Sequence, residues 1–211
     1  MINLIHGDCM EYMATLKDNE FDLAVVDPPY GIGNWIPQNP SNQSKNITTK
    51  PTVNWNDKPP SQIYFDELQR VSKRQIIWGT NWFRNQSPNP VLVWFKNMGN
   101  PNFSEVEVAS LSWGRRCDFV HINWTSGFYR TQQDGKQFHP CQKPIKLYQW
   151  IFDKYTQKGW RILDTHLGSG SSAIAAHDSG LDFVGIELDG DYFQAATKRL
   201  ESHQRQLSIS W

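Results

Sequence analysis

Short apolar runs alternate along the chain with segments whose apolar residues recur every three or four positions. The short runs are typical of buried strands, and the longer period is typical of helices that bury one face. We predict strands at 2–5, 21–26, 75–78, 91–95, 161–163 and 183–186. We predict helices at 9–16, 61–72, 145–155, 172–179 and 192–206.

This order of elements predicts an α/β fold with a doubly wound, mostly parallel, Rossmann-like sheet. Residues 106–113 and 119–124 flank a turn at Gly114, and we expect them to form an antiparallel hairpin at one edge of the sheet. The length of 211 residues suits a single domain, 1–211. Ligands of such sheets bind beyond the carboxyl ends of the strands, so residues that follow strands are the first candidates for a site.

The clearest candidate is Asp27-Pro28-Pro29-Tyr30, which directly follows an apolar run at 23–26. Each proline lacks an N–H and fixes φ, so the carbonyls of Asp27 and Pro28 are left to accept hydrogen bonds. Asp27 adds a carboxylate, and Tyr30 adds a flat ring for stacking. These groups suit a planar ring that carries an exocyclic amine, such as a nucleobase. An ordinary strand-ending turn is the alternative for this motif taken alone.

The second candidate is the segment 164–171, Asp-Thr-His-Leu-Gly-Ser-Gly-Ser, followed by Glu187 after the next predicted strand. A glycine turn between a strand and a helix lets a ligand approach the backbone and face the helix N-terminus. An acid about 20 residues later can accept both hydroxyls of a ribose. The pair predicts a nucleoside-type cofactor. Ser172 and Ala173 stand where a dinucleotide fingerprint has its third glycine, so pyrophosphate is not favoured.

Charge is unevenly distributed although the net charge is zero. Residues 31–150 carry 14 Lys and Arg against 7 Asp and Glu, and the two flanks together carry 7 against 14. A basic middle segment favours contact with phosphates, and chance segregation is the alternative. The aperiodic loop at 31–60 and the segment 114–138, with Arg115 and Arg116, are the candidate contacts to a nucleic acid.

The sequence has no run of 18 apolar residues and no basic, apolar leader, so we expect a soluble, cytoplasmic protein without a membrane partner. Its three cysteines are Cys9, Cys117 and Cys141. Because they are scattered and odd in number, we expect reduced thiols and no metal site.

Three motifs in this order resemble the β group of exocyclic-amino DNA methyltransferases. They are Asp-Pro-Pro-Tyr at 27–30, His-Pro-Cys-Gln-Lys-Pro at 139–144, and the glycine turn with Glu187. Gly7-Asp8-Cys9 is also similar to a segment of that family, so the resemblance spans nearly the whole chain. It implies a circularly permuted motif order, S-adenosylmethionine as cofactor and DNA as partner. It also implies base flipping, a restriction-modification, orphan or phage setting, and a monomer or homodimer.

The resemblance assigns catalysis to Asp27, Pro28, Pro29 and Tyr30, with the Asp27 carboxylate and the Pro28 carbonyl accepting from the target amine and Tyr30 stacking on the base. It places the methionine part of the cofactor at the glycine turn, with the methionine carboxylate near the turn before Pro144. It places the ribose of the cofactor at Glu187 and the adenine at Asp8 and Cys9. The implied cofactor set is Asp8, Cys9, Asp27, His139, Lys143, Asp164, His166, Gly168, Ser169, Gly170, Ser171 and Glu187.

Two features set this chain apart within the resemblance. Thr165-His166 stands where the family commonly has Pro-Phe, so we expect His166 to replace the Phe ring by edge packing or by a hydrogen bond. Asp27 in place of Ser favours adenine N6 over cytosine N4. We therefore expect an adenine-N6 DNA methyltransferase. The alternatives are a cytosine-N4 or RNA amino-methyltransferase and a non-catalytic subunit that binds cofactor or nucleic acid.

Overall fold

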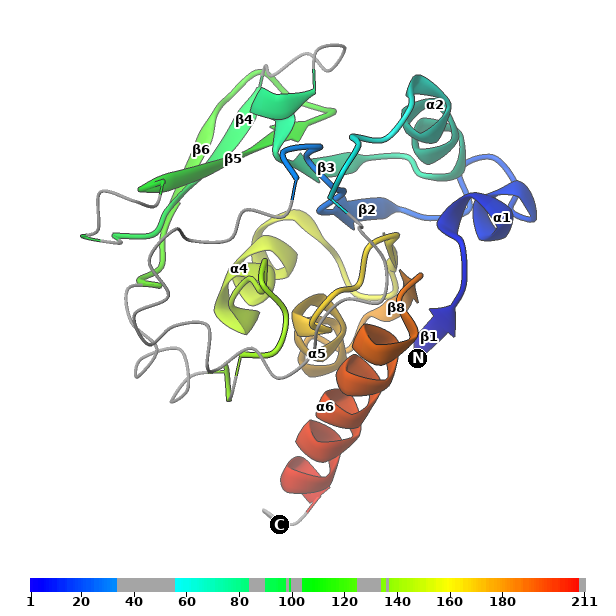
Figure 1. Cartoon of the computed structure of the whole chain (residues 1–211), viewed down its shortest axis with the longest axis vertical. Helices are drawn as coiled ribbons and strands as arrows, with labels where there is room; N and C mark the ends of the chain where they lie inside the picture. Colours follow the sequence, from blue (N-terminus) through cyan, green and yellow to red (C-terminus); the bar gives the residue numbers. More distant parts are fainter. Residues whose placement is uncertain are drawn as a thin grey trace.

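An eight-stranded sheet runs through the protein in the order β1-β8-β7-β2-β3-β5-β4-β6 (Figure 1). The computed structural model describes residues 1–33, 56–83, 90–97, 99, 104–124, 134–135 and 137–208. The strands are β1 (Ile2–His6), β2 (Leu23–Val26), β3 (Gln75–Trp78), β4 (Val91–Phe95), β5 (Val106–Leu111), β6 (Asp118–His121), β7 (Arg161–Asp164) and β8 (Asp182–Glu187). The predicted doubly wound, mostly parallel sheet is confirmed.

The antiparallel part of the sheet differs from the prediction. β5 is antiparallel to both β3 and β4, whereas β6 pairs in parallel with β4 and forms the edge. Residues 106–113 and 119–124 therefore do not form a hairpin with each other, and that prediction was wrong. The reason is that β3 and β4 already occupy both sides of β5, which leaves β6 only the outer side of β4. The antiparallel pair near this edge is β4 with β5.

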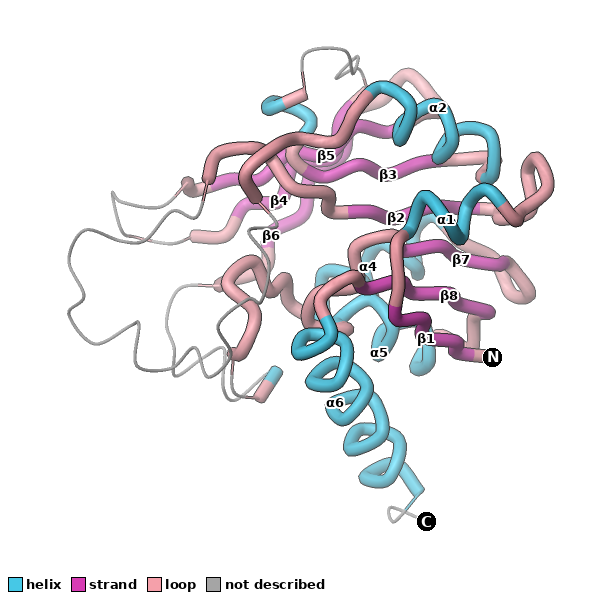
Figure 2. The backbone as a smooth tube through the Cα atoms, turned by 45° about the vertical axis from the view of Figure 1, so that its right-hand side comes forward, coloured by secondary structure: helices cyan, strands magenta, loops and turns pink. Residues whose placement is uncertain are grey.

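Helices cover both faces of the sheet. They are α1 (Cys9–Ala14), α2 (Gln62–Val71), α4 (Ile145–Tyr155), α5 (Ser171–Asp178) and α6 (Gly190–Ser208), with a 3-10 turn η2 (Thr80–Trp82) after β3. Figure 2 shows α1 and α2 on one side of the sheet and α4 and α5 on the other. None of the helices in the described ranges has the length and hydrophobicity needed to span a bilayer.

The alternation of side chains along β2 explains the two cores. Leu23 and Val25 point to the cluster that contains Ile151 of α4, whereas Ala24 and Val26 point to the cluster that contains Leu68 of α2. Successive strand residues face opposite sides of a sheet, so a strand covered on both faces must be apolar throughout. All four β2 residues are accordingly buried, and the site begins only where this run ends.

Truncation of the central core should be costly. We expect Ile162→Ala, at a fully buried position of β7, to lower the free energy of unfolding by about 2–5 kcal/mol, because it removes packed methyl groups and leaves a cavity. The same substitution at Ile63, which is 65% exposed on α2, should change it by less than about 0.5 kcal/mol. Urea denaturation measures both, and equal losses would contradict the assignment of Ile162 to the core.

Candidate active site

The carboxyl ends of four parallel strands meet at one edge of the sheet and surround a cavity of about 250 Å³. The residues after β1 and β2, those after β7 and the end of β8 all contribute to its wall. Most of the predicted site residues line this cavity. They are Asp8, Cys9, Asp27, Pro28, Pro29, Tyr30, His139, Lys143, His166, Gly168, Ser169, Ser171 and Glu187.

Asp164 and Gly170 lie behind the wall and are not among the cavity-lining residues. The Asp164 carboxylate accepts hydrogen bonds from the Ser172 hydroxyl at 2.6 Å and from the His166 N–H at 3.0 Å. Gly170 is the N-cap of α5 with φ +73°, a left-handed conformation that glycine adopts easily. Both residues therefore shape the turn between β7 and α5.

Asp27, whose side chain is 14% exposed, is the centre of a partly buried polar network. Its Oδ1 accepts from the Tyr30 hydroxyl at 2.6 Å, and its Oδ2 pairs with the Lys143 ammonium. Burial raises the pKa of the Asp27 carboxyl, and Lys143 and Tyr30 act in the opposite direction. The pKa of Lys143 is raised, because the nearby carboxylates outweigh its burial. The structure thus brings Lys143 to the Asp-Pro-Pro-Tyr motif, a contact that the motif order alone did not suggest.

The ring of Tyr30 has little room to move. A Cβ on Gly79, directly after β3, would lie 2.1 Å from Tyr30 Cε1. Trp82 of η2 stacks nearly parallel to the ring at 6.4 Å between centroids. Asn56 fixes the backbone beside it, because its Oδ1 accepts from the Tyr30 N–H at 2.9 Å. Tyr30 is therefore set by neighbours from two other segments.

Glu187 fixes the opposite wall. One of its oxygens accepts from the Gly168 N–H at 2.8 Å and the other from the Asp189 N–H at 3.0 Å. Burial raises the pKa of this carboxyl, although these N–H groups act against the shift. Asp8 takes a local role as the N-cap of α1, since its carboxylate accepts from the Met10 N–H at 2.6 Å.

Neutral groups complete this wall. Burial lowers the pKa of His139 to about 3 and that of His166 to about 4, and it raises the pKa of the Cys9 thiol to about 12. His166 is held by two neighbours within the protein, and its expected replacement of a Phe ring at the cofactor stays a prediction. Its Nδ1 lies 2.9 Å from the Thr165 hydroxyl oxygen, and its ring packs edge-on against Tyr64 at 5.4 Å.

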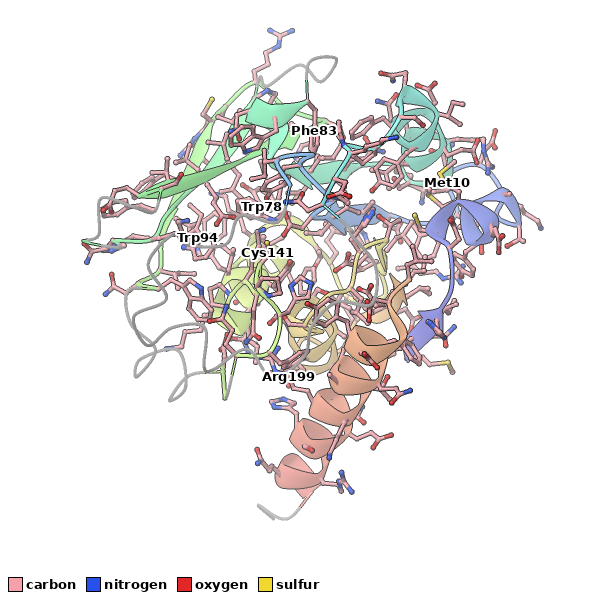
Figure 3. All side chains as sticks on the ribbon, viewed as in Figure 1. Met10, Trp78, Phe83, Trp94, Cys141 and Arg199 are labelled. Carbon is pink, nitrogen blue, oxygen red and sulfur yellow. The ribbon has the colours of Figure 1, made fainter. Side chains whose placement is uncertain are left out.

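The glycine turn is held from α6. Arg199 donates to the Ser169 carbonyl and to the Ser171 hydroxyl, both at 2.9 Å, and points from α6 toward the turn (Figure 3). These bonds connect the cavity wall to a helix with its own packing against the sheet. Arg199 is a residue that the motif search missed, because nothing near it in the sequence marks it.

Two further residues were missed. Tyr192 lines the cavity with a buried hydroxyl that has no hydrogen-bond partner among the described residues. Glu107 of β5 lies 3.2 Å from Lys143 Nζ. The one signal for Glu107 in the sequence was an acid between two valines in a predicted strand, where charged residues are uncommon. The Glu107 side chain is 27% exposed.

The candidate DNA-contacting segments are described only in part. Residues 34–55 of the first and 125–133 and 136 of the second lie outside the described residues. Arg115 and Arg116 are exposed in the turn between β5 and β6. Arg116 Nε is 4.0 Å from the Asp118 carboxylate, the limit for an ion pair.

Comparisons with known proteins agree with this fold. The profile of the N6/N4 DNA methylase family matches residues 34–198. The Type II methyltransferase M2.DpnII of Streptococcus pneumoniae is 25% identical over 246 residues, which cover 94% of this chain and 89% of that protein. The crystal structure of M1.HpyAVI matches with a TM-score of 0.62 at 21% identity, over 95% of this chain and 98% of that one. The PvuII cytosine-N4-specific DNA methyltransferase matches with a TM-score of 0.60 at 12% identity, over 97% and 90%. At these identities the two solved structures establish the fold.

Two glycines with nearly the same φ angle, Gly79 and Gly114, allow a test of how tightly the Tyr30 ring is held. Gly79 has φ +74° and contacts Tyr30, whereas Gly114 has φ +78° and a Cβ added there would meet no atom within 4 Å. Alanine at either site should cost about 1–2 kcal/mol for the left-handed conformation. We expect Gly79→Ala to lower the free energy of unfolding by at least about 1 kcal/mol more, because the methyl group displaces the ring. Equal losses in urea denaturation would show that the ring yields freely.

Proposed function

Because the chain belongs to the N6/N4 DNA methylase family, we propose that it transfers a methyl group from S-adenosylmethionine to N6 of adenine in DNA. Enzymes of this family are DNA methyltransferases that use this cofactor. The observation that supports the choice of an amine acceptor is the Asp27 carboxylate, buried and paired with Tyr30 and Lys143 at the end of β2. Adenine is proposed over cytosine because the motif begins with Asp27.

The cavity wall opposite Asp27 fits a nucleoside with a positively charged sulfur. Gly168 lets the backbone of the glycine turn pack close to the His139 ring, since a Cβ at this position would lie 3.3 Å from that ring. The buried hydroxyl of Tyr192 is a donor without a partner among the described residues. The histidines of this wall are neutral at physiological pH, so they do not oppose a bound cation. We assign the cofactor to the glycine turn, Glu187 and the segment 7–9.

When bound there, S-adenosylmethionine supplies a methyl carbon, and the electrons of the broken carbon–sulfur bond stay on sulfur. The protein's part is to prepare the acceptor nitrogen, whose lone pair is delocalised into the base. The Asp27 carboxylate and the Pro28 carbonyl accept from the N–H groups, which favours a pyramidal nitrogen with an available lone pair. As that pair forms the new bond, the nitrogen loses one proton, and we assign the Asp27 carboxylate, which accepts from that N–H, as the group that takes it.

The acceptor in a duplex must leave the base stack to reach this cavity, at a cost of a few kcal/mol. Tyr30 is positioned to recover part of that cost, because stacking on an aromatic side chain is worth about 1–3 kcal/mol per base. The basic segment 31–150 supports a polyanionic partner.

The central experiment measures transfer of labelled methyl groups to DNA. We expect the product, digested to nucleosides, to carry the label on N6-methyladenine. Asp27→Ala should reduce transfer by at least about 100-fold, because it removes the acceptor that stabilises the charged nitrogen. Asp153→Ala changes an exposed acid of α4 and should leave the rate unchanged.

Label on N4-methylcytosine would replace adenine by cytosine as the substrate. An Asp27→Ala variant as active as the wild type would exclude the proposed role of the motif. Absence of transfer by the folded wild type to any DNA would favour the non-catalytic alternative.

Glu187 is expected to act on cofactor affinity alone. Glu187→Gln should weaken binding of S-adenosylmethionine by about tenfold or more, because it removes a charged acceptor that also fixes the Gly168 and Asp189 N–H groups. Asp153→Ala, which changes an exposed acid of α4, is the matched comparison and should bind the cofactor within about threefold of the wild type. Titration calorimetry measures both, and an unchanged affinity of Glu187→Gln would remove this carboxylate from the proposed cofactor site.

A further inference from the structure

Four charged side chains form a continuous row from the cavity into the sheet. Asp27 Oδ2 pairs with Lys143, Lys143 Nζ lies 3.2 Å from Glu107 Oε2, and Glu107 Oε1 lies 3.0 Å from Lys96 Nζ. The four residues come from the end of β2, the turn before α4, β5 and the residue after β4. Two carboxylates and two ammonium groups alternate, so the row carries no net charge.

The two lysines of the row are shielded from water, and the two carboxylates are shielded in part. The side chains of Lys143 and Lys96 are 4% and 10% exposed, and those of Asp27 and Glu107 are 14% and 27% exposed. Lys143 Nζ also lies 5.4 Å from the centre of the buried Trp78 ring, a residue labelled in Figure 3. Buried charges persist only where each has a partner. Lys143 has two such partners, Asp27 and Glu107, although one carboxylate is enough to neutralise its charge.

The first partner conflicts with the proposed reaction. Tyr30 already donates to Asp27 Oδ1, and the Lys143 ammonium occupies Oδ2. The target amine needs an oxygen of this carboxylate, and its nitrogen becomes positively charged as the new bond forms. A fixed ammonium on the same oxygen would repel that charge in a site with little water to screen it.

The second partner offers a resolution. Each oxygen of Glu107 faces one lysine, Oε1 toward Lys96 and Oε2 toward Lys143. Glu107 is not among the residues that line the cavity, so a substrate does not displace it. Lys143 can release Asp27 without becoming an unpaired buried charge, because its contact with Glu107 is already in place.

We propose that the Lys143 ammonium binds Oδ2 of Asp27 in the free enzyme and leaves this oxygen when the target amine binds. Lys143 is then held by Glu107 alone, and we call it a placeholder for the amine. Glu107 is on this view a positioning residue that acts through Lys143. The inference rests on the proposed amino-methyltransferase function and adds to it the way in which the acceptor site is kept closed and then opened.

A double-mutant cycle on methyl transfer tests this. Glu107→Gln removes the alternative partner, so Lys143 should stay on Asp27 and kcat should fall about tenfold or more, because only a fraction of the complexes is competent. The KM for DNA and the affinity for S-adenosylmethionine should stay within about threefold, since Glu107 does not line the cavity. Glu107→Asp keeps the charge on a shorter side chain and should give an intermediate kcat.

The decisive variant is Glu107→Gln combined with Lys143→Met. If Glu107 acts through Lys143, the double variant should be no less active than Lys143→Met alone. Glu105→Gln, an exposed acid next to the same strand, is the matched control and should resemble the wild type. Unchanged kcat in Glu107→Gln, or losses that multiply in the double variant, would overturn the placeholder. Wild-type activity in the same assay separates this outcome from failure of the proposed function.

Discussion

The burial of one carboxylate, that of Asp27, is the constraint on which the arrangement of the site depends. A carboxylate removed from water is stable only if hydrogen-bond donors and an opposite charge replace the lost solvation. The Tyr30 hydroxyl and the Lys143 ammonium supply these, one on each oxygen. Lys143 is buried in turn and requires Glu107, and Glu107 pairs with Lys96. A single acid at the end of β2 thus fixes residues from four segments.

The direction of β5 makes this compensation possible. Because β5 is antiparallel to β4, Val106 pairs with Phe95 and Glu107 with Trp94. The beginning of β5 therefore lies where the parallel strands end. A parallel β5 would carry Glu107 to the opposite edge of the sheet, away from Lys143. The strand that interrupts the parallel order is the one that delivers the second carboxylate to the site.

The sequence located the residues of the cavity well where they directly follow strands. Apolar runs locate β2, β7 and β8, and parallel pairing brings Asp27 and Glu187 to one edge. It predicted poorly where an interaction depends on strand direction. Residues 106–113 read equally well as one arm of a hairpin, and in that arrangement Glu107 has no relation to Asp27. Alternation along a strand indicates which side chains share a face of the sheet, but it does not indicate with which strands this strand pairs.

Asp164 shows a second limit of motif reading. It follows the same pattern as Asp27 and Glu187, an acid where a parallel strand ends, yet its oxygens bind the Ser172 hydroxyl and the His166 N–H behind the cavity wall. Burial raises its pKa to about 7, and the charges of Asp27 and Glu187 add to the shift. Position after a strand brings an acid to the edge of the sheet. Whether it faces the cavity is decided by local donors that compete for it.

The two walls of the cavity solve opposite electrostatic problems. On the proposed acceptor side the largely buried Asp27 carboxylate has to be neutralised and yet remain available, which is possible because Lys143 also contacts Glu107. On the proposed cofactor side a sulfonium cation has to be accepted, and a fixed positive charge beside the sulfur would oppose it. There, burial holds the pKa of His139 to about 3 and that of His166 to about 4, so both rings are neutral from mildly acidic to basic pH. As neutral groups, the two histidines keep polar ring nitrogens in the wall. The His166 nitrogen lies beside the Thr165 hydroxyl, and the His139 nitrogen accepts from the Cys141 N–H. Neither ring adds a charge that would repel the proposed cofactor.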